Sequence, residues 1–314
     1  MSEADATIVA VTTLTKRFAD VTAVDRLSFA VTRGEIFGLV GPDGCGKSTT
    51  MRMLAGVMQP NNGGIIIDRV DVVADPEAAK GHVSYMPQRF GLYDDLTVDE
   101  NIRFYADLFE VPYKLRDERA ARLLSASGMT EFRGRLAGQL SGGMKQKLGL
   151  TCSLVHTPQV LLLDEPTTGV DPISRRDFWR ILYSLREEGV TILIATAYLD
   201  EAERCNRLAL LYRGHVLHCD TPAALKQRMP GALVAVSSSA GRAARTALAG
   251  VAGVTQVILV GDGIHAVVDD ADRRTPELRA ALQNANVPFD KIAIAEPSIE
   301  DVFVALLDGG GGTS

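Results

Sequence analysis

The sequence has no long apolar run, no cluster of basic residues and few cysteines, and each absence excludes a class of protein. None of its apolar stretches approaches the roughly 18–20 residues needed to cross a bilayer. Its 33 Lys and Arg residues are scattered among 39 Asp and Glu, for a formal net charge of −6, so we expect no nucleic-acid partner. The four cysteines lack metal-site spacing, and we expect no disulfide among them. The polar, acidic residues 1–6 do not have the pattern of a secretory signal.

Apolar periodicity in residues 7–225 indicates a large α/β domain. Short apolar strands, such as 160–163, alternate with helical patterns, which favours a mixed sheet with a largely parallel core. Residues 97–135 have a helical pattern that places four apolar side chains on one face, namely Ile102, Tyr105, Leu108 and Phe109. We therefore expect a helical subdomain at about 89–150 within this domain.

The pattern changes after residue 225. Small strands and helices alternate over residues 231–308, which predicts a separate, small α+β domain. Residues 309–314 are rich in glycine and cannot pack a core, so we expect a flexible tail there.

A glycine-rich segment follows the apolar residues 35–40. Its sequence, Gly41-Pro42-Asp43-Gly44-Cys45-Gly46-Lys47-Ser48, fits the phosphate-binding pattern G-x-x-x-x-G-K-[ST], and a helical pattern follows at 49–56. Glycine permits the positive φ angles and the close backbone approach that a triphosphate requires. The pattern predicts an ATP site in which Lys47 reaches the β- and γ-phosphates and Ser48 binds Mg²⁺. The predicted nucleotide-contacting residues of this segment are Gly41, Asp43, Gly44, Cys45, Gly46, Lys47, Ser48 and Thr49.

Cys45 lies inside this loop, and the sequence leaves two positions open for its thiol. We expect the backbone N–H group of Cys45 to face the β-phosphate. The side chain either shares that surface, so that bound ATP would shield the thiol from reagents, or it is buried and inert.

Two carboxylates follow the apolar strand at residues 160–163. A buried strand beside a phosphate loop would deliver Asp164 to the Mg²⁺ shell through a water molecule. Glu165, one residue further on, can then polarise the attacking water as a general base. The alternative is an ordinary strand that ends in a solvated acidic turn.

Residues 140–147 (Leu-Ser-Gly-Gly-Met-Lys-Gln-Lys) resemble the LSGGQ signature of ABC ATPases, with Met144 in place of Gln. In that family two cassettes face each other head to tail, and each signature closes on the nucleotide held by the other phosphate loop. A Ser-Gly-Gly helix start presents N–H donors that suit a γ-phosphate. The resemblance therefore implies a P-loop NTPase ABC cassette fold in which Ser141, Gly142 and Gly143 contact ATP.

The resemblance covers residues 7 to about 225 and extends to three further positions. Phe18 matches the aromatic residue that stacks on adenine, and the alternative is an ordinary surface or core Phe. Gln88 matches the Q-loop glutamine, which contacts Mg²⁺ and links the ATP site to a membrane partner. Asp171 matches the D-loop carboxylate at the dimer seam. The apolar residues after Gln88 either receive a short helix of that partner or pack a hinge; they are Phe90, Leu92 and Tyr93.

The chain departs from the family at residue 197, where a histidine that senses the γ-phosphate is expected and Ala197 stands. No histidine lies between His156 and His215 to replace it. Removing one preorganised donor from a developing phosphoryl charge costs about 10²–10³-fold in rate. We therefore expect this site to bind ATP and to hydrolyse it slowly, because the donor at residue 197 is missing. We do not expect complete inactivity, because Glu165 remains.

The phosphate loop, the signature and residues 195–202 together are similar to the first cassette of fused, two-cassette ATPases. Residues 297–303 resemble the end of the C-terminal domain of drug-exporter ATPases. The resemblance implies a cytoplasmic ATPase, bound to the inner face of the plasma membrane through integral membrane permease subunits, that powers an ABC-2 type exporter. It also implies a second ABC cassette, to which the tail would lead, and a regulatory domain at 231–308. The alternative is a ribosome-associated or other non-transport ABC ATPase, which would normally carry basic extensions or a long charged linker.

Overall fold

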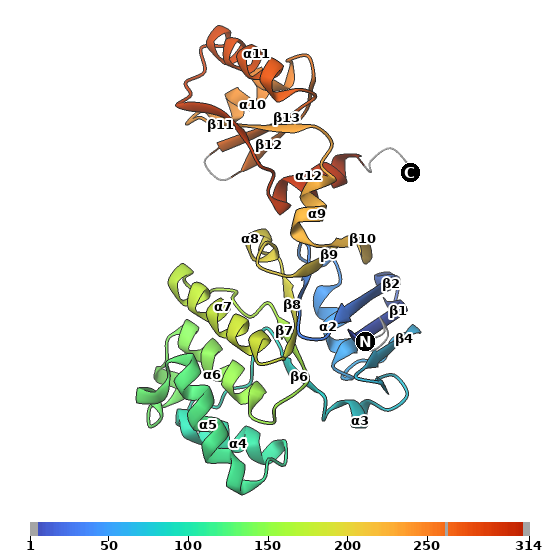
Figure 1. Ribbon diagram of the computed structural model, residues 1–314, viewed down its shortest axis with the longest axis vertical. Coiled ribbons are helices and arrows are strands. Elements are labelled where there is room, and N and C mark those ends of the chain that lie inside the picture. The colour runs from blue at the N-terminus through green and yellow to red at the C-terminus, as the bar shows by residue number, and fades with distance from the viewer. Residues whose placement is uncertain (1–5, 261–262, 310–314) are drawn as a thin grey trace. The chain divides into compact units, whose positions relative to one another are not determined.

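The computed structural model describes residues 6–260 and 263–309, and the chain divides into two compact units, Met1–Cys219 and Asp220–Ser314 (Figure 1). The predicted cassette domain, 7–225, ends within the second unit, inside the helix α9 (Pro222–Gln227). None of the helices in the described ranges is both long and apolar enough to cross a bilayer.

The first unit is built around a six-stranded sheet in the order β10-β9-β3-β8-β7-β6. Strand β3 pairs in parallel with β8 and β9, and β7 pairs in parallel with β6 and β8, which confirms the largely parallel core. The bounds are β3 (Ile36–Val40), β6 (Val83–Met86), β7 (Val160–Asp164), β8 (Thr191–Thr196), β9 (Arg207–Tyr212) and β10 (His215–Asp220).

A second, antiparallel sheet has the order β2-β1-β4-β5. Alternating apolar residues in the sequence predict strands at 8–13 and 27–32. The strands β1 and β2 are longer, because bulges interrupt the two-residue period and still let each strand continue. A turn in which Ala19 has a φ of 46° joins them. The bounds are β1 (Thr7–Phe18), β2 (Val21–Thr32), β4 (Asn62–Ile67) and β5 (Val70–Asp71).

The parallel strands are buried on both faces, so alternate side chains enter two different cores. Val160 and Leu162 pack against α2 (Lys47–Leu54) and the antiparallel sheet. Leu161 packs on the other side, against α7 (Pro172–Glu187). Figure 1 shows the parallel sheet between these two layers. Consecutive apolar residues of this kind are typical of parallel strands covered on both sides.

Three helices form the predicted helical subdomain: α4 (Val98–Leu108), α5 (Tyr113–Ser127) and α6 (Gly142–Leu154). Thr97 and Glu100 form a capping box that starts α4. Ile102 is buried, and Tyr105 and Phe109 pack against the same core. The expected position of Leu108 is wrong, since its side chain is 61% exposed. Six residues after Ile102 correspond to about 1.7 helical turns, which takes Leu108 off the buried face.

The second unit has the element order β-α-β-β-α-β of a ferredoxin-like fold, with an antiparallel sheet ordered β12-β13-β11-β14. The sequence pattern predicts a helix at 277–285, but α11 begins six residues earlier, because Asp270 caps its start and the helix accommodates Pro276. The predicted tail lies outside the described residues from 310 onward. The bounds are β11 (Ala232–Ser237), α10 (Gly241–Ala249), β12 (Val254–Val260), β13 (Gly263–Val268), α11 (Ala271–Asn284), β14 (Lys291–Ala295) and α12 (Ile299–Gly309).

A buried ion pair fastens α12 to the sheet of the second unit. Asp301 is fully buried, and its Oδ1 lies 2.7 Å from Nδ1 of His265 on β13. The Ser298 hydroxyl donates to the other carboxylate oxygen at 2.6 Å. The hydrogen bond to Asp301 raises the pKa of His265, although burial opposes it. Burial would raise the pKa of Asp301, but the hydrogen bonds from His265 and Ser298 lower it overall.

We expect the attachment of α12 to weaken as the pH rises from 6 to 8. A histidine whose folded-state pKa is raised contributes its full stability below its unfolded pKa, and that stability is lost as the pH passes through the folded value. Amide hydrogen exchange of peptides from β13 and α12, corrected for the intrinsic rate, should therefore be faster at pH 8 than at pH 6. His265→Gln should abolish this difference, and fluorescence of Trp179 in the first unit serves as the control. The same pH dependence in the variant would contradict the assignment.

Candidate functional site

The loop between β3 and α2 is shaped by two glycines. The N–H group of Gly41 donates to the carbonyl oxygen of Thr196 at 3.3 Å, and a Cβ atom on Gly41 would lie 2.2 Å from the carbonyl oxygen of Leu211. Gly46 has a φ of 106°, and a Cβ atom there would lie 2.5 Å from the carbonyl oxygen of Ala23. A side chain is excluded at both positions, because only glycine lets the backbone of the loop approach its neighbours this closely.

Lys47 is buried at the start of α2. Lys47 is 4% exposed, and its Nζ donates to the carbonyl oxygens of Gly41 (2.8 Å) and Pro42 (3.1 Å). The same nitrogen lies 3.3 Å from Oε1 of Glu165 and 3.8 Å from Oδ1 of Asp43. A buried ammonium is stable only with such partners. The predicted phosphate-binding lysine thus meets the predicted general base directly.

Asp164 ends strand β7 and is 1% exposed. The Ser48 hydroxyl donates to its Oδ1 at 2.8 Å, and the Tyr85 hydroxyl donates to its Oδ2 at 3.1 Å. Burial raises the pKa of Asp164, and the two hydrogen bonds oppose that shift. Two predicted metal-binding residues, Ser48 and Asp164, therefore lie in contact.

Glu165 adopts a left-handed backbone conformation, with a φ of 49°. A non-glycine residue in that region is held there by its surroundings, and such positions cluster at functional sites. Its Oε2 accepts a hydrogen bond from Gln88 Nε2 at 2.9 Å and a longer one from Thr168 Oγ1 at 3.4 Å. The three predicted catalytic residues, Lys47, Gln88 and Glu165, are thus brought together.

These residues border a hollow of about 400 Å³ at the carboxyl ends of the parallel strands. The residues that line it are Ala23, Asp43, Gly44, Gly46, Lys47, Ser48, Thr49, Gln88, Glu165 and Thr168. Most of them were predicted from the phosphate-loop pattern and from the family resemblance. A buried cation, open glycine backbone and the hydroxyl groups of Ser48, Thr49 and Thr168 suit a polyanion.

The side chains at this hollow also fit Mg²⁺. In the described part of the chain, no group of three or more His, Cys, Asp and Glu side chains could hold a metal ion. A cation here would instead take oxygen ligands from Ser48 and Gln88, together with nucleotide phosphates. Asp164, which contacts Ser48 and does not line the hollow among the described residues, would join the Mg²⁺ shell through a water molecule. Magnesium in nucleotide sites is held in this way, by few protein groups and the substrate's own oxygens.

Two predicted ATP-contacting segments start neighbouring helices. Ser141 caps α6, its hydroxyl accepting from the Met144 N–H group. Asp171 caps α7, for which the sequence pattern predicts a start at about 175. The helix begins three residues earlier because Pro172 suits its first turn. A Cβ atom on Gly143 would lie 2.6 Å from the Ser174 side chain, so the two helix starts touch. Within the described residues, neither segment lines the hollow at Lys47.

Phe18 ends strand β1 and is 45% exposed. The Lys16 ammonium lies 5.3 Å from the centre of its ring. Phe18 is likewise outside the described lining of the hollow, and its role as an adenine platform stays a prediction.

The Cys45 side chain is buried. It is 2% exposed and belongs to the core between α2 and the antiparallel sheet. Burial raises the pKa of the thiol, although the nearby Lys47 opposes the shift. The Cys45 N–H group donates to the Pro42 carbonyl at 3.3 Å. The geometry favours the buried, inert thiol of the two alternatives.

Three residues of this region were not predicted from the sequence: Tyr85, Thr168 and Glu201. Tyr85 and Thr168 contact the two acidic side chains described above. Glu201 is fully buried and accepts hydrogen bonds from Thr167 (2.6 Å), Thr196 (2.8 Å) and Trp179 (3.1 Å). A carboxylate four residues after Ala197 was visible in the sequence, but its partners come from segments far apart in the chain.

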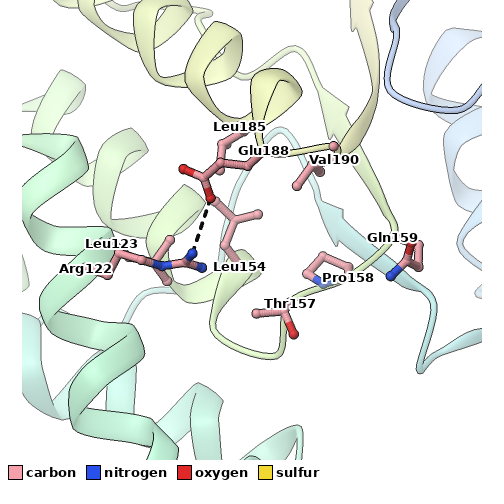
Figure 2. A pocket seen from close by; sticks show the side chains of 10 residues that line it. Arg122, Leu123, Leu154, Thr157, Pro158, Gln159, Leu185, Glu188 and Val190 are labelled. Atoms are coloured by element: carbon pink, nitrogen blue, oxygen red, sulfur yellow. Dashed lines mark hydrogen bonds and ion pairs between the residues drawn. The ribbon is translucent and has the colours of Figure 1, made fainter.

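A second hollow, of about 210 Å³, lies at the amino ends of β7 and β8, away from the phosphate loop (Figure 2). Nη1 of Arg122 lies 3.3 Å from Oε2 of Glu188 beside it, above an apolar floor that includes Leu154 and Leu185. None of the predicted site residues lines it.

Comparisons with known proteins agree with this geometry. Residues 24–168 match the model of the ABC transporter family. The chain is 43% identical over 306 residues to the "Probable multidrug ABC transporter ATP-binding protein YbhF" of Escherichia coli K12, an alignment that covers 96% of this chain and 52% of that protein. This chain thus spans about half the length of that relative.

Two further similarities cover most of both partners. The chain is 33% identical over 299 residues to the "Daunorubicin/doxorubicin resistance ATP-binding protein DrrA" of Streptomyces peucetius, covering 93% of this chain and 90% of that one. A solved structure described as an ATP-binding subunit of an ABC transporter matches with a TM-score of 0.64 and 28% identity, covering 70% of this chain and 92% of that one.

Glu165→Gln is expected to tighten nucleotide binding by this chain. Without nucleotide, the Glu165 carboxylate lies 3.3 Å from the Lys47 ammonium and competes with any phosphate for it. Removing that charge should raise the affinity for Mg²⁺-free ATP about fivefold, equivalent to about 1 kcal/mol. Titration with a fluorescent ATP analogue measures the effect. Asp43→Asn is the matched control, since its carboxylate is 90% exposed and 3.8 Å from the same ammonium. Weaker binding by Glu165→Gln, or an equal gain in the control, would contradict the expectation.

Proposed function

This chain belongs to the family of ABC transporter ATP-binding proteins, ATPases that are coupled to transport, and we propose that it binds MgATP at residues 41–48 and powers an ABC-2 type exporter. The observation that carries the proposal is the meeting of Lys47, Gln88 and Glu165 at the hollow beside the phosphate loop. The names of the relatives support transport over the alternative of a ribosome-associated ATPase, because one is a multidrug ABC transporter protein and another is a drug-resistance protein.

In this proposal Lys47 binds the phosphates, while Ser48, Gln88 and Asp164 hold Mg²⁺. The ion, when bound, would neutralise phosphate charge that develops during transfer. Glu165 orients the attacking water and takes its proton, and the donors Gln88 and Thr168 keep its carboxylate in place. Phe18 offers a face on which adenine can stack.

We infer slow turnover at this site from Ala197. Residue 197 follows the end of β8, next to Thr196, whose carbonyl accepts from the phosphate-loop residue Gly41. A side chain at 197 would therefore start beside the nucleotide, and alanine has no hydrogen-bond donor to offer there. Glu165 still supplies a base, so the expected activity is low rather than absent.

A second cassette completes the proposed machine. Ser141, Gly142, Gly143 and Asp171 stand together at two helix starts, outside the described lining of this chain's own hollow. They would contact ATP held by a facing cassette, where a helix start can approach the γ-phosphate.

The membrane partner has a candidate surface next to Gln88. Phe90 and Leu92 pack against the core of the helical subdomain, which fits the hinge alternative. Tyr93 is 44% exposed and lies 4.6 Å, centre to centre, from the ring of Phe104, which is 37% exposed. We propose that these two rings, with the exposed Leu108, meet a permease at the inner face of the membrane. The second unit would regulate this assembly.

Lys47→Ala is the direct test of the proposed function. The variant should lose tight MgATP binding, at least about a hundredfold, because the phosphates lose their buried cation. Isothermal titration of the full chain measures this, and Lys80→Ala, which removes an exposed lysine, is the control. Co-purification of the chain with an integral membrane protein from native membranes tests the coupling. Unchanged affinity in Lys47→Ala would overturn the nucleotide site.

Two variants in the complete assembly test the inequality of its ATP sites. Ser141→Arg would put a large cation where a helix start must approach the facing nucleotide, so most turnover should be lost. Glu165→Gln should do less, because its own site already lacks a donor at 197. Ser141 also caps α6, so Ser141→Ala is included to separate loss of the cap, worth about 1 kcal/mol, from the added bulk. Equal damage from Glu165→Gln and Ser141→Arg in steady-state ATPase assays would contradict unequal sites.

A further inference from the structure

We propose that Tyr85 is a positioning residue, whose hydroxyl group holds the Asp164 carboxylate in the orientation that serves Mg²⁺ at the nucleotide site. The inference rests on the proposed function and deepens it, because it concerns the same site. Tyr85 and Asp164 both lie outside the described lining of the hollow, and Asp164 contacts Ser48, which lines it. Tyr85 would therefore act through Asp164 and not on the nucleotide.

Sheet geometry brings the two side chains together. Strands β6 and β7 run parallel, and Tyr85 lies opposite Leu162. Side chains alternate along a strand, so Tyr85, Leu162 and Asp164 project from the same face. The Tyr85 hydroxyl then reaches forward to Oδ2 of Asp164 at 3.1 Å.

The carboxylate is held at both of its oxygens. The hydroxyl group of Ser48, a residue of α2, donates to Oδ1 at 2.8 Å. The hydroxyl group of Tyr85, on the neighbouring strand β6, donates to Oδ2. Two donors from different elements fix the rotation of the carboxylate about its Cβ–Cγ bond. Without the Tyr85 hydroxyl, one oxygen of a carboxylate that is 1% exposed would lose its described partner and the plane could turn away from Ser48.

Tyr85 is suited to a test of this role because its ring and its hydroxyl group have separate contacts. Its ring packs against the core between α2 and the antiparallel sheet. Phenylalanine would keep that packing, so the hydroxyl can be removed by itself. Mutating a residue that orients a metal ligand through a hydrogen bond typically lowers the metal affinity about 10–100-fold.

The experiment compares Tyr85→Phe with the unchanged full chain. Binding of a fluorescent ATP analogue is measured without Mg²⁺, and MgCl₂ is then titrated at a fixed concentration of the analogue. We expect Mg²⁺-free affinity within about twofold of the unchanged chain and a Mg²⁺ midpoint raised about tenfold. Tyr183→Phe, which removes a hydroxyl from a ring packed in the other core of the first unit, should change neither value.

A double-mutant cycle shows whether Tyr85 acts through Asp164. Asp164→Asn should raise the Mg²⁺ midpoint by itself, and adding Tyr85→Phe should then have no further effect. An unchanged Mg²⁺ midpoint in Tyr85→Phe would overturn the inference. A fall in Mg²⁺-free affinity together with a fall in thermal stability would also overturn it, since the two losses would indicate a purely structural role. If the unchanged chain binds no ATP, the proposed function itself fails, and the positioning role fails with it.

Discussion

The site depends on the burial of the Lys47 ammonium group. A cation that is nearly excluded from water must be compensated, and here two loop carbonyls and the Glu165 carboxylate do so. The carbonyls are available because glycine at positions 41 and 46 lets the loop fold closely over its neighbours. The strand that leads into Glu165, β7, is separated from β3 by β8, so Glu165 reaches Lys47 from one strand further along the sheet. A polyanionic ligand bound beside Lys47 would therefore replace the Glu165 carboxylate as the negative charge that compensates the ammonium group.

Much of this site was predictable, because its local patterns carry their own geometry. A strand, a glycine-rich turn and a helix in that order specify where Lys47 and Ser48 point, and the apolar strand before Asp164 and Glu165 specifies the sheet edge at which they end. The antiparallel strands were underestimated, since bulges in β1 and β2 break the alternation on which the prediction relied. The prediction for Leu108 was wrong because its apolar character alone does not say which face of the helix it occupies.

The unpredicted residues share a physical reason. Tyr85 meets Asp164, and Glu201 meets Thr167, across long separations in sequence. Nothing in the local sequence of a tyrosine on a strand says which strand will be its neighbour; strand order decides it. The burial of Cys45 is similar, since its thiol belongs to a core whose other members, such as Val9 and Ile65, lie far from it in the sequence. Motifs identify the residues that face a ligand, and packing identifies those that hold them in place.

The surroundings of Ala197 bear on why the site should be slow. The Glu201 carboxylate accepts from Thr196, just before Ala197, and from Thr167, two residues after Glu165. Trp179 of α7 donates to the same carboxylate, which is fully buried. The segment that lacks the histidine and the segment that carries the base are thus fixed to one group. Since these hydrogen bonds hold both segments, we expect Ala197 to act through a missing donor and not through a displaced loop, and to reduce the rate of hydrolysis more than the affinity for ATP.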